Sequence, residues 1–144
     1  MSAPFSLPAE NRLHVLLVED DEEVRGVLTN LLALENVQVT QAKNGEIAWN
    51  FLTETSGSTV DAVISDIAMP KLNGYQLLEK LRSVPTHART PFILISGNPD
   101  RARVQSRDAD GALIHAYEPD DFFPKPFDVL DLIKRIQTLI QAPI

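Results

Sequence analysis

The stretch VISDIAMPKLNG, residues 63–74, decides which fold the rest of the chain is expected to adopt. The apolar run that begins at Ala62 is typical of a buried β-strand, and Pro70 and Gly74 mark a loop soon after it. Asp66 is therefore expected at the carboxyl end of a strand, the edge at which open α/β sheets bind ligands. An isolated Asp at such a position is more often a turn residue or helix cap, so the flanking segments must distinguish the two roles.

Four further segments have the composition of β-strands. LHVLLV (13–18) and FILI (92–95) are almost continuously apolar, as expected for central strands of a parallel sheet that are buried on both faces. VQVT (37–40) alternates and is rich in β-branched residues, and FF (122–123) is predicted to be a short last strand. With the strand that ends at Asp66, five strands are predicted.

A helical segment is predicted after each predicted strand. The first helix carries one apolar stripe, formed by Val24, Val27, Leu28, Leu31 and Leu32. A short second helix is predicted from the apolar residues Ile47, Ala48, Phe51 and Leu52. A third helix is expected to begin at Gly74 and a fourth at residues 99–100, and the last is an amphipathic helix over 129–140. Five strands that alternate with five helices predict a three-layer α/β sandwich with a parallel sheet.

Composition and charge narrow the class of protein. The 144 residues are 44% hydrophobic and 23% charged, which is ordinary for one globular domain. The absence of cysteine excludes disulfides, thiolate catalysis and cysteine-ligated zinc. No apolar run approaches the roughly 20 residues of a membrane helix, and no secretory signal is evident, so a cytoplasmic protein without membrane insertion is expected. A net charge of −7 without a Lys/Arg cluster argues against direct nucleic-acid binding.

The chain is expected to form one domain. Residues 1–12 hold two prolines and no apolar periodicity, so they are predicted to be a flexible leader. Residues 13–144 are predicted to be the single domain, and no effector domain is expected in the few residues after 140. The chain is then either a stand-alone domain or one cut from a longer protein.

Polar residues follow four of the five predicted strands. Glu19 and Asp20 come after the first strand, Asp66 ends the third, Ser96 ends the fourth, and Lys125 follows the fifth. In a parallel sheet, these strand ends share one edge, so the side chains can gather in one pocket. Three adjacent carboxylates are costly unless a cation or protons neutralise them, and oxygen ligands suit Mg²⁺ or Mn²⁺. A lysine and a hydroxyl beside them could hold a phosphoryl group.

Four stretches together resemble one known family. LLVEDDEEVR (16–25), VISDIAMPKLNGYQLLEKLR (63–82), FILISG (92–97) and DDFFPKPF (120–127) are similar to the receiver domain of two-component response regulators, of the chemotaxis-regulator type. The resemblance covers residues 13–140. It implies a flavodoxin-like sandwich whose parallel strands have the order 2-1-3-4-5.

The resemblance also implies a phosphoacceptor and a metal site. Asp66 would be the nucleophile that accepts a phosphoryl group from a phosphohistidine. Mg²⁺ would be held by Glu19, Asp20, Asp66 and the backbone carbonyl of Ala68.

Further implied residues contact the phosphoryl group or respond to it. Lys125 would contact a phosphoryl oxygen, and the peptide bond between Lys125 and Pro126 would be cis. Ser96 would hydrogen-bond to the phosphoryl group and carry the switch. Phe122 matches the aromatic switch residue of the family, although a plain core phenylalanine is a competing interpretation.

By this resemblance the protein is a signalling switch and has no separate substrate. A histidine kinase or histidine phosphotransfer protein would donate the phosphoryl group, the domain would promote its own phosphorylation and dephosphorylation, and an unknown downstream protein would receive the signal. One departure is extra length around residues 107–119, which leaves the output partner and the dimer mode open.

Three alternatives stay open from the residues alone. An aspartyl phosphatase usually has a second Asp two residues after the nucleophile, where this chain has Ala68. A receiver-like interaction module that is never phosphorylated tends to lose an acid or the lysine, and this chain keeps them. Flavin binding lacks a phosphate-cradling loop rich in Ser, Thr and Gly after the first strand.

Overall fold

The computed structural model describes residues 12–54, 60–69, 72–97 and 119–141. Five strands form one parallel sheet in the order β2-β1-β3-β4-β5, which confirms the predicted strand order. The strands are β1 (His14–Val18), β2 (Gln38–Ala42), β3 (Ala62–Asp66), β4 (Phe92–Ser96) and β5 (Asp121–Pro124). The helices are α1 (Glu22–Leu34), α2 (Gly45–Glu54), α3 (Gly74–Arg82), the short 3₁₀ helix η2 (Pro85–His87) and α5 (Val129–Gln141).

Three predicted segments lie wholly or mostly outside the described residues. The helix expected from residues 99–100 and the extra length around 107–119 lie outside the described residues, apart from Pro119. The same holds for the predicted leader, apart from Arg12. The described part of the chain therefore has four α-helices where five were predicted for the whole. Among these described helices, none has the length and hydropathy needed to cross a bilayer.

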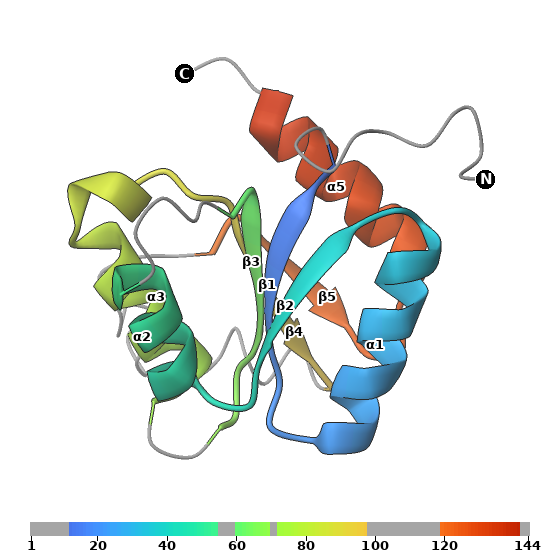
Figure 1. Ribbon diagram of the computed structural model, residues 1–144, viewed down its shortest axis with the longest axis horizontal. Helices are drawn as coiled ribbons and strands as arrows, with labels where there is room; N and C mark the ends of the chain where they lie inside the picture. The colour runs from blue at the N-terminus through green and yellow to red at the C-terminus, as the bar shows by residue number, and fades with distance from the viewer. Residues whose placement is uncertain (1–11, 55–59, 70–71, 98–118, 142–144) are drawn as a thin grey trace, which may run out of the picture.

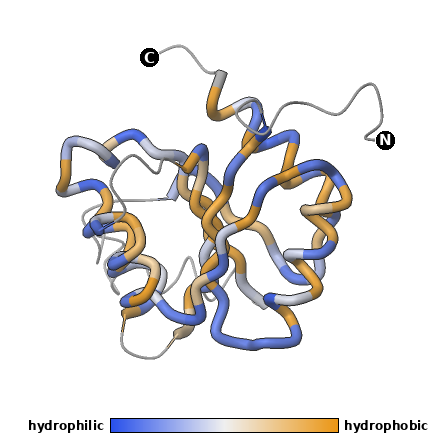
Figure 2. The backbone as a smooth tube through the Cα atoms, in the orientation of Figure 1, coloured by the Kyte–Doolittle hydropathy of each residue, from blue (hydrophilic) through white to orange (hydrophobic). Residues whose placement is uncertain are grey.

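The helices cover both faces of the sheet. Figure 1 shows α1 and α5 on one side of the strands, and α2 and α3 on the other. Because side chains alternate along a strand, neighbouring strand residues belong to opposite layers of the core. One layer takes strand residues Leu16, Val18, Val63, Phe92 and Leu94. The other takes Val15, Leu17, Ile64, Ile93 and Ile95. Figure 2 shows hydrophobic positions concentrated along the central strands.

Side-chain caps start the two helices that follow the polar strand ends. The Asp21 carboxylate accepts a hydrogen bond of 3.1 Å from the Val24 amide at the start of α1. Asn73 and Gln76 form a reciprocal capping box at the start of α3, with both bonds 2.9 Å long. Part of the acidic run after β1 is therefore explained by helix capping, as predicted.

The apolar stripe of α1 is only partly buried. Leu32 is fully buried against the sheet, whereas Val27 and Leu31 are 57% and 41% exposed. Val24, Val27, Leu28 and Leu31 line an open groove of about 690 Å³ together with Lys125, Pro126 and Phe127. The stripe is thus wider than the surface that the sheet and α5 cover.

A substitution of Gly74 by alanine should destabilise the fold. An added Cβ would lie 2.6 Å from the Asp66 backbone oxygen and 2.7 Å from Leu94 Cδ2, so backbone must move. We expect Gly74→Ala to lower the free energy of unfolding by about 1–3 kcal/mol, measured by urea denaturation.

The matched control is Gly26→Ala on α1, where an added Cβ meets no atom within 4 Å. This variant should be more stable than the wild type by about 0.5–1 kcal/mol, because alanine favours a helix interior. Equal effects of the two substitutions would contradict the packing argument.

Candidate functional site

Three carboxylates meet at the carboxyl edge of the sheet. β1 and β3 pair in parallel with Val18 opposite Ser65, so the residues that follow, Glu19 and Asp66, come side by side. Asp20 joins them from the loop before α1. Each of Glu19, Asp20 and Asp66 offers an oxygen atom, and these oxygens all lie within 4.8 Å of one another. The cluster predicted from the strand ends is therefore formed.

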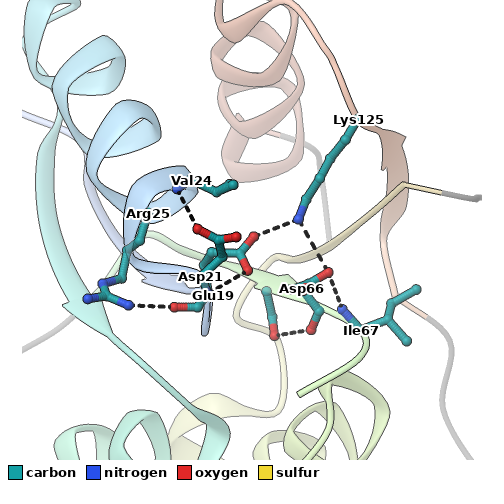
Figure 3. Close-up of polar contacts among 8 residues, drawn as sticks. Glu19, Asp21, Val24, Arg25, Asp66, Ile67 and Lys125 are labelled. Carbon is teal, nitrogen blue, oxygen red and sulfur yellow. Dashed lines mark hydrogen bonds and ion pairs between the residues drawn. The ribbon is translucent and has the colours of Figure 1, made fainter. Parts of the chain in front are cut away.

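Lys125 reaches this cluster from the carboxyl end of β5. Its Nζ lies 2.6 Å from Glu19 Oε1 and 3.6 Å from Asp66 Oδ1. Figure 3 draws both contacts as dashed lines. The Lys125 amide donates a 2.7 Å hydrogen bond to the Ser96 carbonyl, which fixes the backbone beside the end of β4. The Lys125–Pro126 peptide bond is cis, as expected.

Backbone amides orient two of the carboxylates. The Ile67 amide donates to Asp66 Oδ1 over 3.0 Å, and the Asp21 amide donates to Glu19 Oε2 over 3.2 Å. Neither donor was predicted from the sequence. No residue pattern identifies them, because every residue except proline has an amide and only the loop conformation aims it.

Burial makes the cluster electrostatically unfavourable when fully charged. The Glu19 side chain is 1% exposed, and desolvation raises its pKa to about 7 despite the hydrogen bond from Lys125. Burial also raises the pKa of Asp66, opposed by the charge of Lys125. Burial alone would lower the pKa of Lys125, but the hydrogen bond to Glu19 and the Asp66 charge outweigh it and raise this pKa. One ammonium thus faces three carboxylates, and a further cation would lower the energy of the pocket.

The donor set fits a hard divalent cation. All three side chains offer carboxylate oxygen, and the distance between their oxygens allows one ion to contact them together. Mg²⁺ and Mn²⁺ prefer such ligands, whereas softer metals prefer nitrogen or sulfur.

Three further residues were predicted for the site: Ser96, Phe122 and Ala68, the last through its backbone carbonyl. Ser96 is the half-buried last residue of β4, and Ala68 is exposed in the loop after β3. Phe122 is half-buried on β5, packs against the core layer of α2 and α3, and has its ring centroid 6.5 Å from that of Tyr75. The roles of Ser96, Phe122 and the Ala68 carbonyl stay predictions.

The fold and the acidic edge together define a receiver domain. Residues 15–137 match the family model of the response regulator receiver domain, and the chain belongs to this family. Its place is thus in two-component signalling, among domains that bind Mg²⁺ at an acidic pocket.

Individual proteins and structures agree with this assignment. The transcriptional regulatory protein CpxR of Escherichia coli (strain K12) is 33% identical over 127 residues, which cover 88% of this chain and 49% of CpxR. The signal receiver domain of a signal transduction histidine kinase from Syntrophus aciditrophicus is 28% identical, with a TM-score of 0.69 and coverage of 88% of this chain and 89% of that one.

A third similarity concerns the fold alone. The receiver domain of the sensor histidine kinase PA1611 of Pseudomonas aeruginosa PAO1 has a TM-score of 0.71 at 24% identity, and the match covers 91% of this chain and 99% of that one. The chain spans about half or less of the length of the first curated relatives that it matches.

Neutralising Asp66 should stabilise the metal-free protein. Because burial raises its pKa, the charged carboxylate is less favourable in the fold than in water, and an amide of the same shape avoids that cost. We expect Asp66→Asn to raise the melting temperature by a few degrees in EDTA at neutral pH, measured by differential scanning calorimetry.

The control is Glu22→Gln, which removes an exposed charge from the first turn of α1. Losing an acidic residue at a helix N-terminus should give no gain in stability. If both variants melt at a higher temperature, the effect comes from net charge rather than from the buried cluster.

Proposed function

We propose that the protein is a phosphorylation-dependent switch that accepts a phosphoryl group on Asp66 from a histidine kinase or a histidine phosphotransfer protein. The observation that carries the proposal is the position of Asp66: it ends β3 within the three-carboxylate cluster, with Lys125 Nζ 3.6 Å from its Oδ1. Membership of the receiver family supports the same chemistry.

The transfer is an in-line displacement at phosphorus. A carboxylate oxygen of Asp66 forms the new O–P bond, and the P–N bond to the donor histidine breaks with its electron pair going to the imidazole. Charge gathers on the equatorial phosphoryl oxygens during this step. Lys125, held at the pocket by Glu19, is placed to offset that charge.

Mg²⁺ or Mn²⁺ would be held by Glu19, Asp20, Asp66 and the backbone carbonyl of Ala68. The bound cation would neutralise phosphoryl oxygens that three carboxylates would otherwise repel. The carboxylate cluster supports this assignment, and the PA1611 receiver domain is described with a magnesium ion coordinated in its active-site cleft.

The switch would run from Ser96 to Phe122. Ser96 would hydrogen-bond to the phosphoryl group and move toward Asp66, and the Phe122 side chain would fill the space it leaves. The half-buried position of Phe122 against Tyr75 supports a ring that can change its packing. The altered surface of this layer would be recognised by a downstream protein.

Phosphorylation can be tested by intact mass spectrometry. Incubation with acetyl phosphate and Mg²⁺ should add about 80 Da, the mass of one phosphoryl group. The adduct should be absent in EDTA and absent in Asp66→Asn, while Glu22→Gln should be labelled like the wild type. No adduct on the wild type, under conditions that label a known receiver domain, would overturn the proposed function.

Lys125 should be needed for transfer and not for metal binding. Lys125→Met removes the cation that would offset charge on the phosphoryl oxygens, so we expect phosphorylation to slow by about 100-fold. Mg²⁺ binding, measured by isothermal titration calorimetry, should be no weaker than in the wild type, because a competing cation has left Glu19 and Asp66.

The matched control is Lys134→Met, which removes an exposed lysine from α5. It should leave both the phosphorylation rate and Mg²⁺ affinity unchanged. Parallel losses of Mg²⁺ affinity and rate in Lys125→Met would show that this lysine supports the pocket structure rather than the transfer step.

A further inference from the structure

The side chain of Arg25 turns back from α1 to the end of β1. Its Nη1 donates a 2.8 Å hydrogen bond to the backbone carbonyl of Glu19, and its Nε donates a 3.2 Å bond to Gln41 Oε1 on β2. Figure 3 shows the guanidinium on the side of Glu19 away from Lys125. Arg25 thus binds the backbone of Glu19, a residue of the carboxylate cluster, and a side chain of the neighbouring strand β2.

Hydrogen bonds hold the peptide groups on both sides of Glu19. Its amide donates a 3.1 Å bond to the Ala42 carbonyl at the end of β2, which continues the parallel pairing by one step beyond Val18. Its carbonyl lies past the paired part of β1, and the residue is 1% exposed. A buried carbonyl needs a partner, and the Arg25 guanidinium supplies it.

Fixing this carbonyl also fixes the start of Asp20. The peptide bond is planar, so the Glu19 carbonyl, the Asp20 amide and the Asp20 Cα move as one unit. Asp20 is exposed, and its backbone has left the sheet. The direction of its carboxylate therefore depends on how firmly the preceding peptide plane is held.

We propose that Arg25 is a positioning residue for the divalent-cation site: by holding the Glu19 carbonyl, it keeps the Glu19 and Asp20 carboxylates aimed at the cation. This inference rests on the proposed function, in which these carboxylates bind Mg²⁺. Gln41 is the second anchor of the guanidinium, so it contributes through Arg25.

Position and charge have opposite consequences for Mg²⁺ binding. If Arg25 acted only through its positive charge, its removal would make the pocket more negative and Mg²⁺ would bind more tightly. If Arg25 holds the peptide plane, its removal lets the ligands spread and Mg²⁺ binds more weakly. The sign of the change therefore separates the two roles.

The test is a calorimetric titration of the full chain with Mg²⁺. Loss of a partner that orients metal ligands typically costs 10–100-fold in affinity, so we expect Arg25→Met to bind Mg²⁺ about 10-fold more weakly. Arg25→Lys should recover only part of the affinity, because an ammonium can donate to the Glu19 carbonyl but lacks the planar fork that reaches both acceptors. Lys43→Met, which removes an exposed cation just after β2, should not weaken binding.

A second readout separates positioning from general damage. With acetyl phosphate as donor, Arg25→Met should need a higher Mg²⁺ concentration for half-maximal phosphorylation but should reach the wild-type rate at saturating Mg²⁺. If Arg25→Met does not fold, Gln41→Leu decides the question, since it removes one anchor and leaves Arg25 in place. Weaker Mg²⁺ binding by Gln41→Leu would support the inference, and wild-type binding would overturn it.

The remaining outcomes are also decisive. Suppose that the wild type binds Mg²⁺ and is phosphorylated on Asp66. Unchanged or tighter Mg²⁺ binding by a folded Arg25→Met variant would then overturn only the proposed role of Arg25. A wild type that neither binds Mg²⁺ nor accepts a phosphoryl group would overturn the proposed function, and this inference with it.

Discussion

Lys125 and Glu19 form an ion pair across the edge of the sheet, with 2.6 Å between Nζ and Oε1 and with the glutamate almost fully buried. The two residues are 106 positions apart in the chain, so this contact exists only when the first and last strands have taken their places. Glu19 and Asp66, two carboxylates that have lost most of their water, share a single ammonium, with the exposed Asp20 beside them. Such buried charges are tolerated only where they are compensated. The pocket therefore has an excess of negative charge that a bound divalent cation would neutralise.

The opposite end of the sheet contains a second ionic contact that places β5. The Arg82 guanidinium at the end of α3 donates to the Thr90 carbonyl over 2.6 Å and to Asp120 Oδ2 over 3.1 Å. Asp120 in turn accepts from the Phe92 amide and donates its own amide to the Phe92 carbonyl, each over 2.8 Å. These bonds start the pairing of β4 with β5, whose far end carries Lys125. The position of the lysine beside Glu19 thus depends on contacts formed at both ends of the last strand.

Close packing between the start of α3 and the end of β3 leaves no room for a side chain at Gly74. Gly74 lies at the start of α3 against the Asp66 backbone, where a side chain would collide with the oxygen of that residue. The cap formed by Asn73 and Gln76 fixes this helix start, and the Asp21 cap fixes the start of α1 behind Glu19 and Asp20. Two capped helices and one glycine therefore hold the loops that carry the acidic side chains.

The sequence by itself determined the succession of the five strands along the chain. It also determined the convergence of Glu19, Asp20, Asp66 and Lys125, because polarity changes sharply where each buried strand ends and parallel strands share that edge. Apolar periodicity also predicted the amphipathic helix over 129–140, which forms as α5 with Leu132, Ile133 and Ile136 buried. It overestimated the buried face of α1, since a stripe shows which residues can be buried and not how much surface neighbouring elements cover. The contact of Arg25 with the Glu19 carbonyl, the amides aimed at Asp66 and Glu19, and the place of Phe122 beside Tyr75 were decided only by the tertiary structure. Each depends on the direction of a backbone or side-chain group in three dimensions, which residue type and spacing along the chain do not encode.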